Sequence, residues 1–180
     1  LVSMIGKGEQ SLLKGVMLHT RITDEKDEGG NTALMRAALH GEIEIVKALL
    51  RNGADVNTRN HEGRTALMFA VINLHTATVK TLLRFGADVN AQADDEFTPL
   101  ILAACSGDIG IVKALLNSGA DARKTSMSGE TALSHAAEHG SSAIVELLKR
   151  AMGLSTELKP QRFSTDIGRR QEIAGALSAN

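Results

Sequence analysis

The hexapeptide TALMRA at residues 32–37 is the first of four closely similar stretches in this chain. The others are TALMFA at 65–70, TPLILA at 98–103 and TALSHA at 131–136, so successive copies start 33 residues apart. A fixed period of this length indicates stacked copies of one structural unit rather than a single globular core. We therefore expect an elongated array whose repeats together display a binding surface.

The period also holds outside the hexapeptide. Gly-Ala-Asp recurs at 53–55, 86–88 and 119–121, and a valine followed three and four positions later by leucines recurs at 46, 79 and 112. That spacing places the valine and its two leucines on one side of a helix. We expect each of these glycines to lie where a helix ends, with a positive φ.

The first residues of each hexapeptide predict the start of another helix. The threonines at 32, 65, 98 and 131 can cap a helix N-terminus, and Pro99 suits the first helical position. Alanine pairs such as Ala37-Ala38 let neighbouring helices of this kind approach closely, while the second helix of each unit carries the bulkier Ile, Val and Leu. One such unit cannot bury its apolar face alone, so the units must stack.

These residues resemble the ankyrin repeat, in which a turn precedes Thr-Pro-Leu-His-x-Ala-Ala, a Gly, a second helix and a closing Gly-Ala-Asp. The resemblance implies an all-α ankyrin-repeat solenoid, with each unit made of a β-turn finger and two antiparallel helices. We expect one array over residues 1–180, with four full repeats between two partial ones. The expected boundaries are 1–26 for a partial repeat, 27–59, 60–92, 93–125 and 126–151 for the full repeats, and 152–180 for a C-terminal cap.

The two ends carry further expectations. Leu1 and Gly8 stand 33 residues before Leu34 and Gly41, so the chain begins in phase with the first helix of a repeat. We expect more repeats or another domain upstream, with a degenerate N-terminal cap as the alternative. Near the other end, the stretch 168–177 predicts a helix with a polar outer face, which a terminal cap needs.

Two positions depart from the repeat pattern. Leu74 stands where the other repeats have glycine, and we expect Asn73 to take the left-handed conformation there, because Asn tolerates it better than Leu. Glu96 replaces the finger glycine found at 30, 63 and 129, so we expect the third finger to have a different tip shape.

Composition excludes several classes of partner. The net charge is −1, with 20 basic and 21 acidic residues, which gives no electrostatic case for nucleic acid binding. The sequence contains no 18-residue apolar stretch, so no membrane span is expected. The single cysteine, Cys105, excludes an internal disulfide framework and fits a reducing compartment, so we expect a cytoplasmic location. We also expect the protein to be a monomer.

One stretch resembles a catalytic motif. His135, Glu138 and His139 form the H-x-x-E-H arrangement, which could hold zinc between two histidines with the glutamate as base. The stretch is also an ordinary first-helix pattern of the repeat, and no third protein ligand is evident. Cys105 likewise lacks an evident base. We therefore predict no enzyme, no metal and no cofactor, and keep a zinc hydrolase as a remote alternative.

The family resemblance also implies where a partner binds. In similar proteins, partners contact the finger tips and the exposed side of the first helices, a surface called the concave face below. Carrying these positions over repeat by repeat gives Leu39, His40, His61, Arg64, Ile72, Asn73, Asp94, Asp95, Phe97, Cys105, Ser106, Glu138 and His139.

Leu39, Ile72 and Phe97 are apolar at positions that usually face solvent. They could form the apolar centre of an interface, or they could pack against a neighbouring finger. The sequence thus predicts a non-catalytic protein–protein interaction scaffold that binds another protein on its concave face. A regulatory or targeting segment of a larger enzyme or effector is the alternative.

Overall fold

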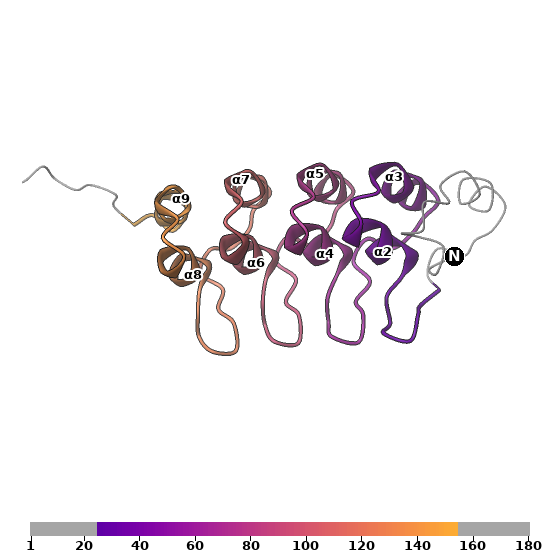
Figure 1. Ribbon diagram of the computed structural model, residues 1–180, viewed down its shortest axis with the longest axis horizontal. Helices are drawn as coiled ribbons and strands as arrows, with labels where there is room; N and C mark the ends of the chain where they lie inside the picture. Colours follow the sequence, from indigo (N-terminus) through magenta and orange to yellow (C-terminus); the bar gives the residue numbers. More distant parts are fainter. Residues whose placement is uncertain (1–24, 155–180) are drawn as a thin grey trace, which may run out of the picture.

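The computed structural model describes residues 25–154, which form eight α-helices arranged as four pairs in one row (Figure 1). The first helices of the pairs are α2 (Ala33–Leu39), α4 (Ala66–Ile72), α6 (Pro99–Ser106) and α8 (Ala132–Glu138). The second helices are α3 (Ile43–Arg51), α5 (Thr76–Arg84), α7 (Ile109–Asn117) and α9 (Ser142–Ala151). Each pair packs mainly against the pairs beside it. The predicted all-α solenoid is therefore confirmed.

The first helices begin as the sequence predicts. The hydroxyl oxygen of Thr32 accepts a hydrogen bond from the backbone N–H of Met35 at 3.3 Å, and Thr131 accepts one from Ser134 at 3.2 Å. Thr98 caps α6 in the same way, with Pro99 directly after it. Each cap satisfies a backbone N–H that has no partner within the helix.

The second helices end at the predicted glycines. Gly53, Gly86 and Gly119 have φ values of 87°, 84° and 89°. The next residue then turns its N–H back to the helix, as in the bond from Ala54 to the carbonyl of Leu49 at 3.1 Å. This left-handed glycine is the usual device for satisfying the last carbonyls of a helix.

Alanines bring the first helices together. Ala37, Ala70, Ala103 and Ala136 occupy one position in the four repeats, and all are 0% exposed. The valines of the second helices are equally buried in three repeats, but Val145 is only half-buried. Within the described residues, α9 has a neighbouring second helix on one side only, which leaves this valine partly uncovered.

The expectation for Asn73 is wrong, because Leu74 takes the left-handed conformation with φ of 60°. The N–H groups of Leu74 and His75 donate to Val71 and Ala70, the bonds that Gly41 and its successor make one repeat earlier. Asn73 remains at the end of α4, and its amide donates to the carbonyl of Phe69 at 2.9 Å. The hydrogen-bond register between the two helices thus decides which residue is strained.

The expectation of a different third finger is wrong for the same reason. The fingers are the hairpin loops at 25–31, 58–64, 91–97 and 124–130, and Glu96 adopts φ of 61° in the third. The N–H of Ala93 bonds to Phe97 at 3.0 Å and that of Glu96 to Ala93 at 2.9 Å, as in the other fingers. The backbone of the tip therefore keeps the common shape, although Glu adopts this φ less readily than Gly.

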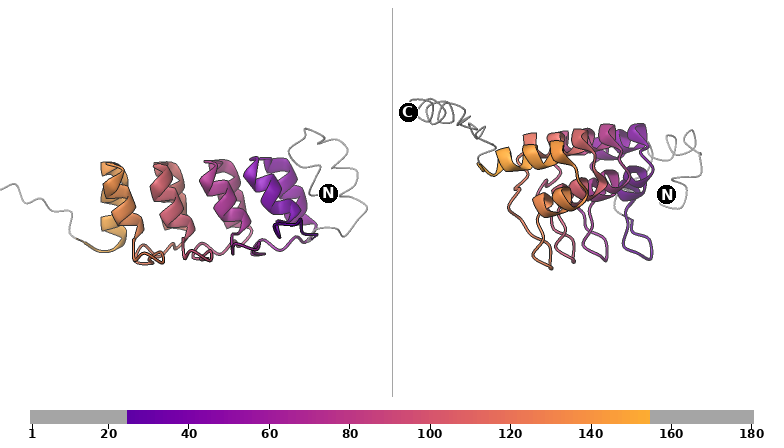
Figure 2. Two further views of the ribbon diagram at one scale, coloured as in Figure 1. Left: turned by 60° about the horizontal axis from the view of Figure 1, so that its bottom comes forward. Right: turned by 60° about the vertical axis from the view of Figure 1, so that its left-hand side comes forward.

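Backbone hydrogen bonds tie each finger to the next. The N–H groups of His61, Asp94 and Met127 donate to carbonyls of the preceding finger at 3.1, 3.0 and 3.2 Å. All four fingers project from the same side of the helix row, with the first helices between them and the second helices (Figure 2). The fingers and first helices therefore form one continuous surface.

The predicted repeat boundaries remain predictions. Most of the partial repeat at 1–26, the helix at 168–177 and most of the cap at 152–180 lie outside the described residues.

Candidate functional site

The concave face has an inner corner where each finger meets the first helix that follows it. One position of the repeat lies in this corner and is occupied by Arg36, Phe69, Leu102 and His135, all half-buried. The two middle repeats thus place apolar side chains in the corner, and the two outer repeats place basic or ionisable ones. The side chain in the corner is therefore basic in the first repeat, apolar in the second and third, and an ionisable histidine in the fourth.

The apolar centre of the concave face lies in the second and third repeats. Phe69, Phe97, Leu102 and Cys105 are half-buried and pack against the core, and Ile72 is 37% exposed. The ring of Phe97 contacts that of His135 on α8 with a centroid distance of 5.8 Å, so Phe97 packs on the following first helix rather than on a neighbouring finger. Five apolar side chains that are partly covered, and partly open to solvent, leave room for a partner to cover the rest.

A small groove continues this centre toward the first repeat. It encloses about 50 Å³ and is lined by Asn31, Met35, Arg36, Leu39 and Phe69. Leu39, one of the predicted apolar residues, is half-buried at its edge. The groove is large enough for little more than a methyl-sized group, so it fits the end of one aliphatic side chain.

An ion pair anchors the first finger to α2. Arg36 Nη2 lies 2.6 Å from Asp27 Oδ2, and Asp27 Oδ1 accepts the N–H of Asn31 at 2.8 Å. Burial acts to raise the pKa of Asp27, but the hydrogen bonds from Arg36 and Asn31 outweigh it and lower this pKa to about 2. The ionised carboxylate therefore stabilises the first finger.

Charged side chains line the tips of the second and third fingers. Arg64 lies 3.2 Å from Glu62 and 3.9 Å from Asp95, which links the two fingers. Together with His61 and Asp94, these residues line an open hollow of about 310 Å³. Because these charges are exposed and screened, they contribute little to stability and are available to a partner.

The H-x-x-E-H stretch does not converge on one point. His135 is half-buried with Nε2 3.5 Å from Glu130 Oε2, whereas His139 is exposed with Nδ1 3.1 Å from the carbonyl oxygen of His135. Among residues 25–154, no three His, Cys, Asp or Glu side chains are grouped so that they could hold a metal ion. Within the described residues, His135, Glu138 and His139 are therefore not brought together as ligands of one metal ion.

Cys105 is not poised as a nucleophile. Burial raises the pKa of its thiol, and the charges of Glu130 and Glu138 raise it further. A thiol with a raised pKa holds less of the reactive thiolate at neutral pH. Cys105 instead contributes a half-buried apolar surface beside Ile72.

The remaining predicted residues are spread along the face rather than gathered at one point. Those exposed to solvent are His40, His61, Asn73, Asp94, Asp95, Ser106, Glu138 and His139, while Arg64 is half-buried.

The predicted surface left out the corner residues Arg36, Phe69, Leu102 and His135. The sequence did hold a signal for them: the position varies between repeats, yet it is apolar in both middle ones. What the sequence could not give is how far the neighbouring repeats cover each of these side chains, all of which are half-buried.

A row of stacked helix pairs with projecting fingers defines a class of repeat proteins that display an extended surface. The family model for ankyrin repeats (three copies) matches residues 5–93 and 78–159, and the chain belongs to the ankyrin repeat family. Ankyrin repeats are generally protein–protein interaction modules. No match was found among curated proteins. None of the helices in the described part of the chain has the length and apolar character needed to cross a bilayer.

Proposed function

We propose that the chain is a non-catalytic interaction module that binds a partner protein on its concave face. The observation that carries this is the apolar centre formed by Phe69, Ile72, Phe97, Leu102 and Cys105, which is bordered by charged finger tips. An apolar centre within a polar rim is the anatomy of a specific protein interface. A few buried contacts at such a centre carry most of the binding free energy.

Rigidity supports this function. The hydrogen bonds between fingers, such as the 3.1 Å bond from His61 to Gly29, fix the finger tips relative to the first helices. A surface that is already ordered loses little conformational entropy on binding. The chain contains four Phe and neither Trp nor Tyr, so we expect the partner to contribute most of the aromatic contacts.

The proposal includes a monomer in a reducing compartment such as the cytoplasm, with no cofactor and no catalytic role. The lone Cys105 supports the compartment, because a chain with one cysteine gains nothing from an oxidising environment. Sedimentation of the purified chain tests the oligomeric state.

The test of the proposed site is a pair of matched substitutions. Ile72→Glu removes an apolar contact from the concave face, where this residue is 37% exposed, and Ile109→Glu changes a residue that is 39% exposed at the start of α7. A partner captured from source lysate is purified and titrated against both folded variants. We expect Ile72→Glu to weaken binding by about 1–2 kcal/mol and Ile109→Glu to leave it unchanged. Equal affinity for the two variants would place the partner elsewhere.

A further inference from the structure

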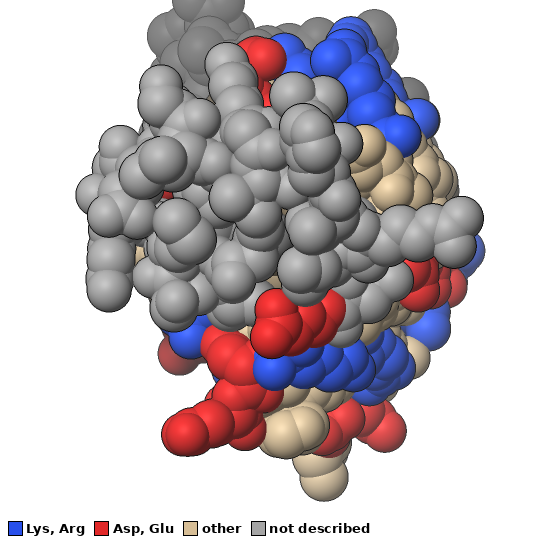
Figure 3. All heavy atoms as spheres, turned by 90° about the vertical axis from the view of Figure 1, so that its right-hand side faces the viewer, with Lys and Arg blue, Asp and Glu red and all other residues tan. Residues whose placement is uncertain are grey.

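The second helices carry a row of cations on the side of the molecule away from the fingers. We call Lys47, Arg51, Lys80, Arg84 and Lys113 the basic ridge. Lys47, Lys80 and Lys113 occupy one repeat position, and Arg51 and Arg84 occupy another. Figure 3 shows Lys and Arg side chains along the upper part of the molecule, on the side of the second helices, while the lower, finger side carries both acidic and basic side chains. A net charge near zero is thus compatible with a local row of basic side chains on the second helices.

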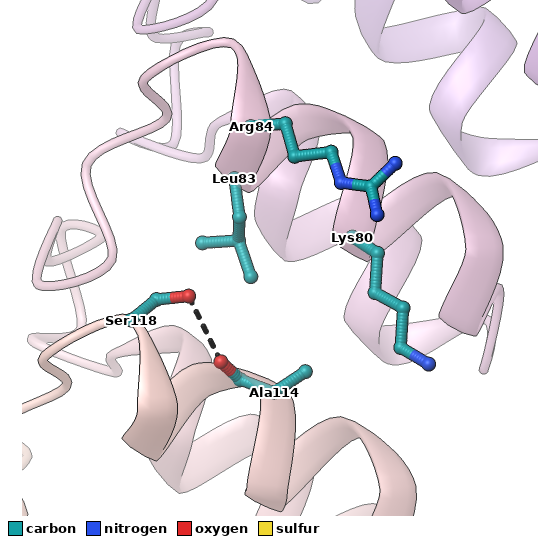
Figure 4. A pocket seen from close by; sticks show the side chains of 5 residues that line it. All are labelled: Lys80, Leu83, Arg84, Ala114 and Ser118. Carbon is teal, nitrogen blue, oxygen red and sulfur yellow. Dashed lines mark hydrogen bonds between the residues drawn. The ribbon is translucent and has the colours of Figure 1, made fainter.

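An open groove of about 280 Å³ lies on the basic ridge, between α5 and α7. Lys80 and Arg84 extend from α5 along one side of it, and Leu83 points into the space between the helices (Figure 4). Ala114 and Ser118 line it from α7, and the hydroxyl of Ser118 already donates to the carbonyl of Ala114 at 2.9 Å. The groove therefore offers two cations over an apolar floor and no further polar donor.

The two cations of the groove lack acidic partners in the described part of the chain. Neither α5 nor α7 contains an Asp or Glu, and no ion pair reaches Lys80 or Arg84 among residues 25–154, whereas Lys47 pairs with Glu44 at 2.9 Å. Lys80 and Arg84 are four residues apart on one helix, a spacing at which like charges destabilise the helix. The repulsion between Lys80 and Arg84 is therefore left unrelieved beside this groove.

We propose that this groove binds an acidic segment of a partner protein. Two carboxylates of the segment pair with Lys80 and Arg84, and an apolar side chain between them rests on Leu83 and Ala114. The pairs steer the segment and fix its register, and the apolar contact adds affinity. The groove lies on the opposite side of the helix pairs from the concave face, so both surfaces can be occupied at once. The chain then bridges two proteins.

The apolar floor favours an acidic peptide segment over a phosphate backbone. The groove is lined by the last turns of α5 and α7, whose carbonyl ends carry partial negative charge, so attraction for an anion comes from Lys80 and Arg84 alone. The apolar floor of Leu83 and Ala114 also has no role in holding a phosphate backbone. Nucleic acids and anionic membranes are therefore outcomes of the test that would contradict the proposal.

The experiment titrates the chain with a fluorescent peptide of about 12 residues, rich in Glu and Asp with one central Leu, and follows its anisotropy. The matched peptides replace the acids by their amides, or the Leu by Ser. We expect the acidic peptide to bind, the amide peptide not to bind, and the affinity to fall about fivefold between about 50 and 200 mM salt. The Leu→Ser peptide should bind about threefold more weakly, since it loses the apolar contact.

Two variants of the chain locate the site. Lys80→Gln with Arg84→Gln should weaken binding at least about tenfold. Lys149→Gln with Arg150→Gln removes the same net charge from α9 and should change affinity less than about twofold. Ile72→Glu, on the concave face, should leave it unchanged, so this proposal and the proposed function fail separately.

Several results would overturn the inference. They are the absence of peptide binding up to about 1 mM, equal binding of the amide peptide, and equal losses in the two double variants. Tighter binding of a single-stranded oligonucleotide of about 12 nucleotides, or of phosphatidylserine vesicles, would replace the acidic segment by a phosphate surface.

Discussion

The third and fourth repeats share one motif but bury its positions to different depths. Leu100 is 1% exposed, whereas Leu133 at the same position is half-buried. Val112 is 0% exposed and Val145 is half-buried. The third repeat has a neighbouring helix pair on each side. Within the described residues, the fourth repeat has a neighbouring pair on one side only, formed by α6 and α7.

The difference teaches that a repeat position has no fixed energetic value. A leucine at this repeat position stabilises the array more when neighbouring repeats cover it more fully. The stability of such an array is the sum of the intrinsic stabilities of its repeats and of the interfaces between them. The middle repeats are held from both sides. Among residues 25–154, they are also the repeats that contain the two non-glycine residues with positive φ, Leu74 and Glu96.

The largest expected effect compares two equivalent leucines. Leu100→Ala should lower the free energy of unfolding by about 3 kcal/mol, because it leaves a cavity between three repeats. Leu133→Ala should lower it by about 1.5 kcal/mol, since part of that side chain is already open. Urea denaturation followed by circular dichroism measures both. Equal losses would mean that another part of the protein covers α8.

Most of the fold could be predicted from the sequence because the period repeats independent signals. Thr32 and Thr131 each predict a cap, and Gly53 and Gly119 each predict a helix end, so every structural feature is indicated several times. The misjudged positions, Asn73 and Glu96, are those where one repeat departs from the others. There the local preference of a residue and the register of its neighbours disagree, and the register prevails.

The candidate site could be predicted only in outline. Exposed finger residues such as Asp94 and His61 follow directly from their repeat positions. The burial of Phe97 does not, because it depends on the ring of His135 from the next repeat. The half-burial of Phe69 and Leu102 depends on how the surrounding side chains cover them, which no periodicity encodes.

A second prediction concerns a finger position that differs in every repeat. It is Asp27, Asn60, Ala93 and Ser126 in turn, so only the first repeat can titrate there. The pKa of Asp27 is lowered to about 2 from 3.8, so its stabilising effect is complete above pH 3.8 and is lost as the pH falls toward 2.

Asp27→Asn should therefore lower stability by about 1 kcal/mol at pH 7, a value reduced for the partial exposure of the pair with Arg36. It should also flatten the fall in stability between pH 4 and pH 2, measured by thermal unfolding across that range. Asp94→Asn, at an exposed tip with a 3.4 Å pair to Arg59, is the matched control and should change neither. A fall in stability that is as steep in Asp27→Asn as in the native chain would contradict the role of this carboxylate.

A third prediction tests the strained residue of the second repeat. Leu74→Gly should raise stability by about 0.5–1 kcal/mol, because glycine adopts the φ of 60° without steric strain. Asn73→Gly should instead lower stability by about 1 kcal/mol, because Asn73 has an ordinary φ of −94° and its amide bonds to Phe69. Thermal unfolding of the two variants separates them. The opposite order of stabilities would restore Asn73 as the left-handed residue.

The smallest expected effect on stability is that of Ile72→Glu, which also connects the comparison of the repeats with partner binding. Leu39, Ile72, Cys105 and Glu138 occupy one position of the concave face, so Ile72→Glu gives the second repeat the residue that the fourth already has. Because Ile72 is 37% exposed, its carboxylate replacement can reach water, and the free energy of unfolding should change by less than about 0.5 kcal/mol. Urea denaturation measures this change, and a loss above about 1 kcal/mol would assign Ile72 to the core. If the stability is unchanged, the side chain of Ile72 contributes nothing to folding. Any loss of affinity in Ile72→Glu then reports a contact between this residue and the partner.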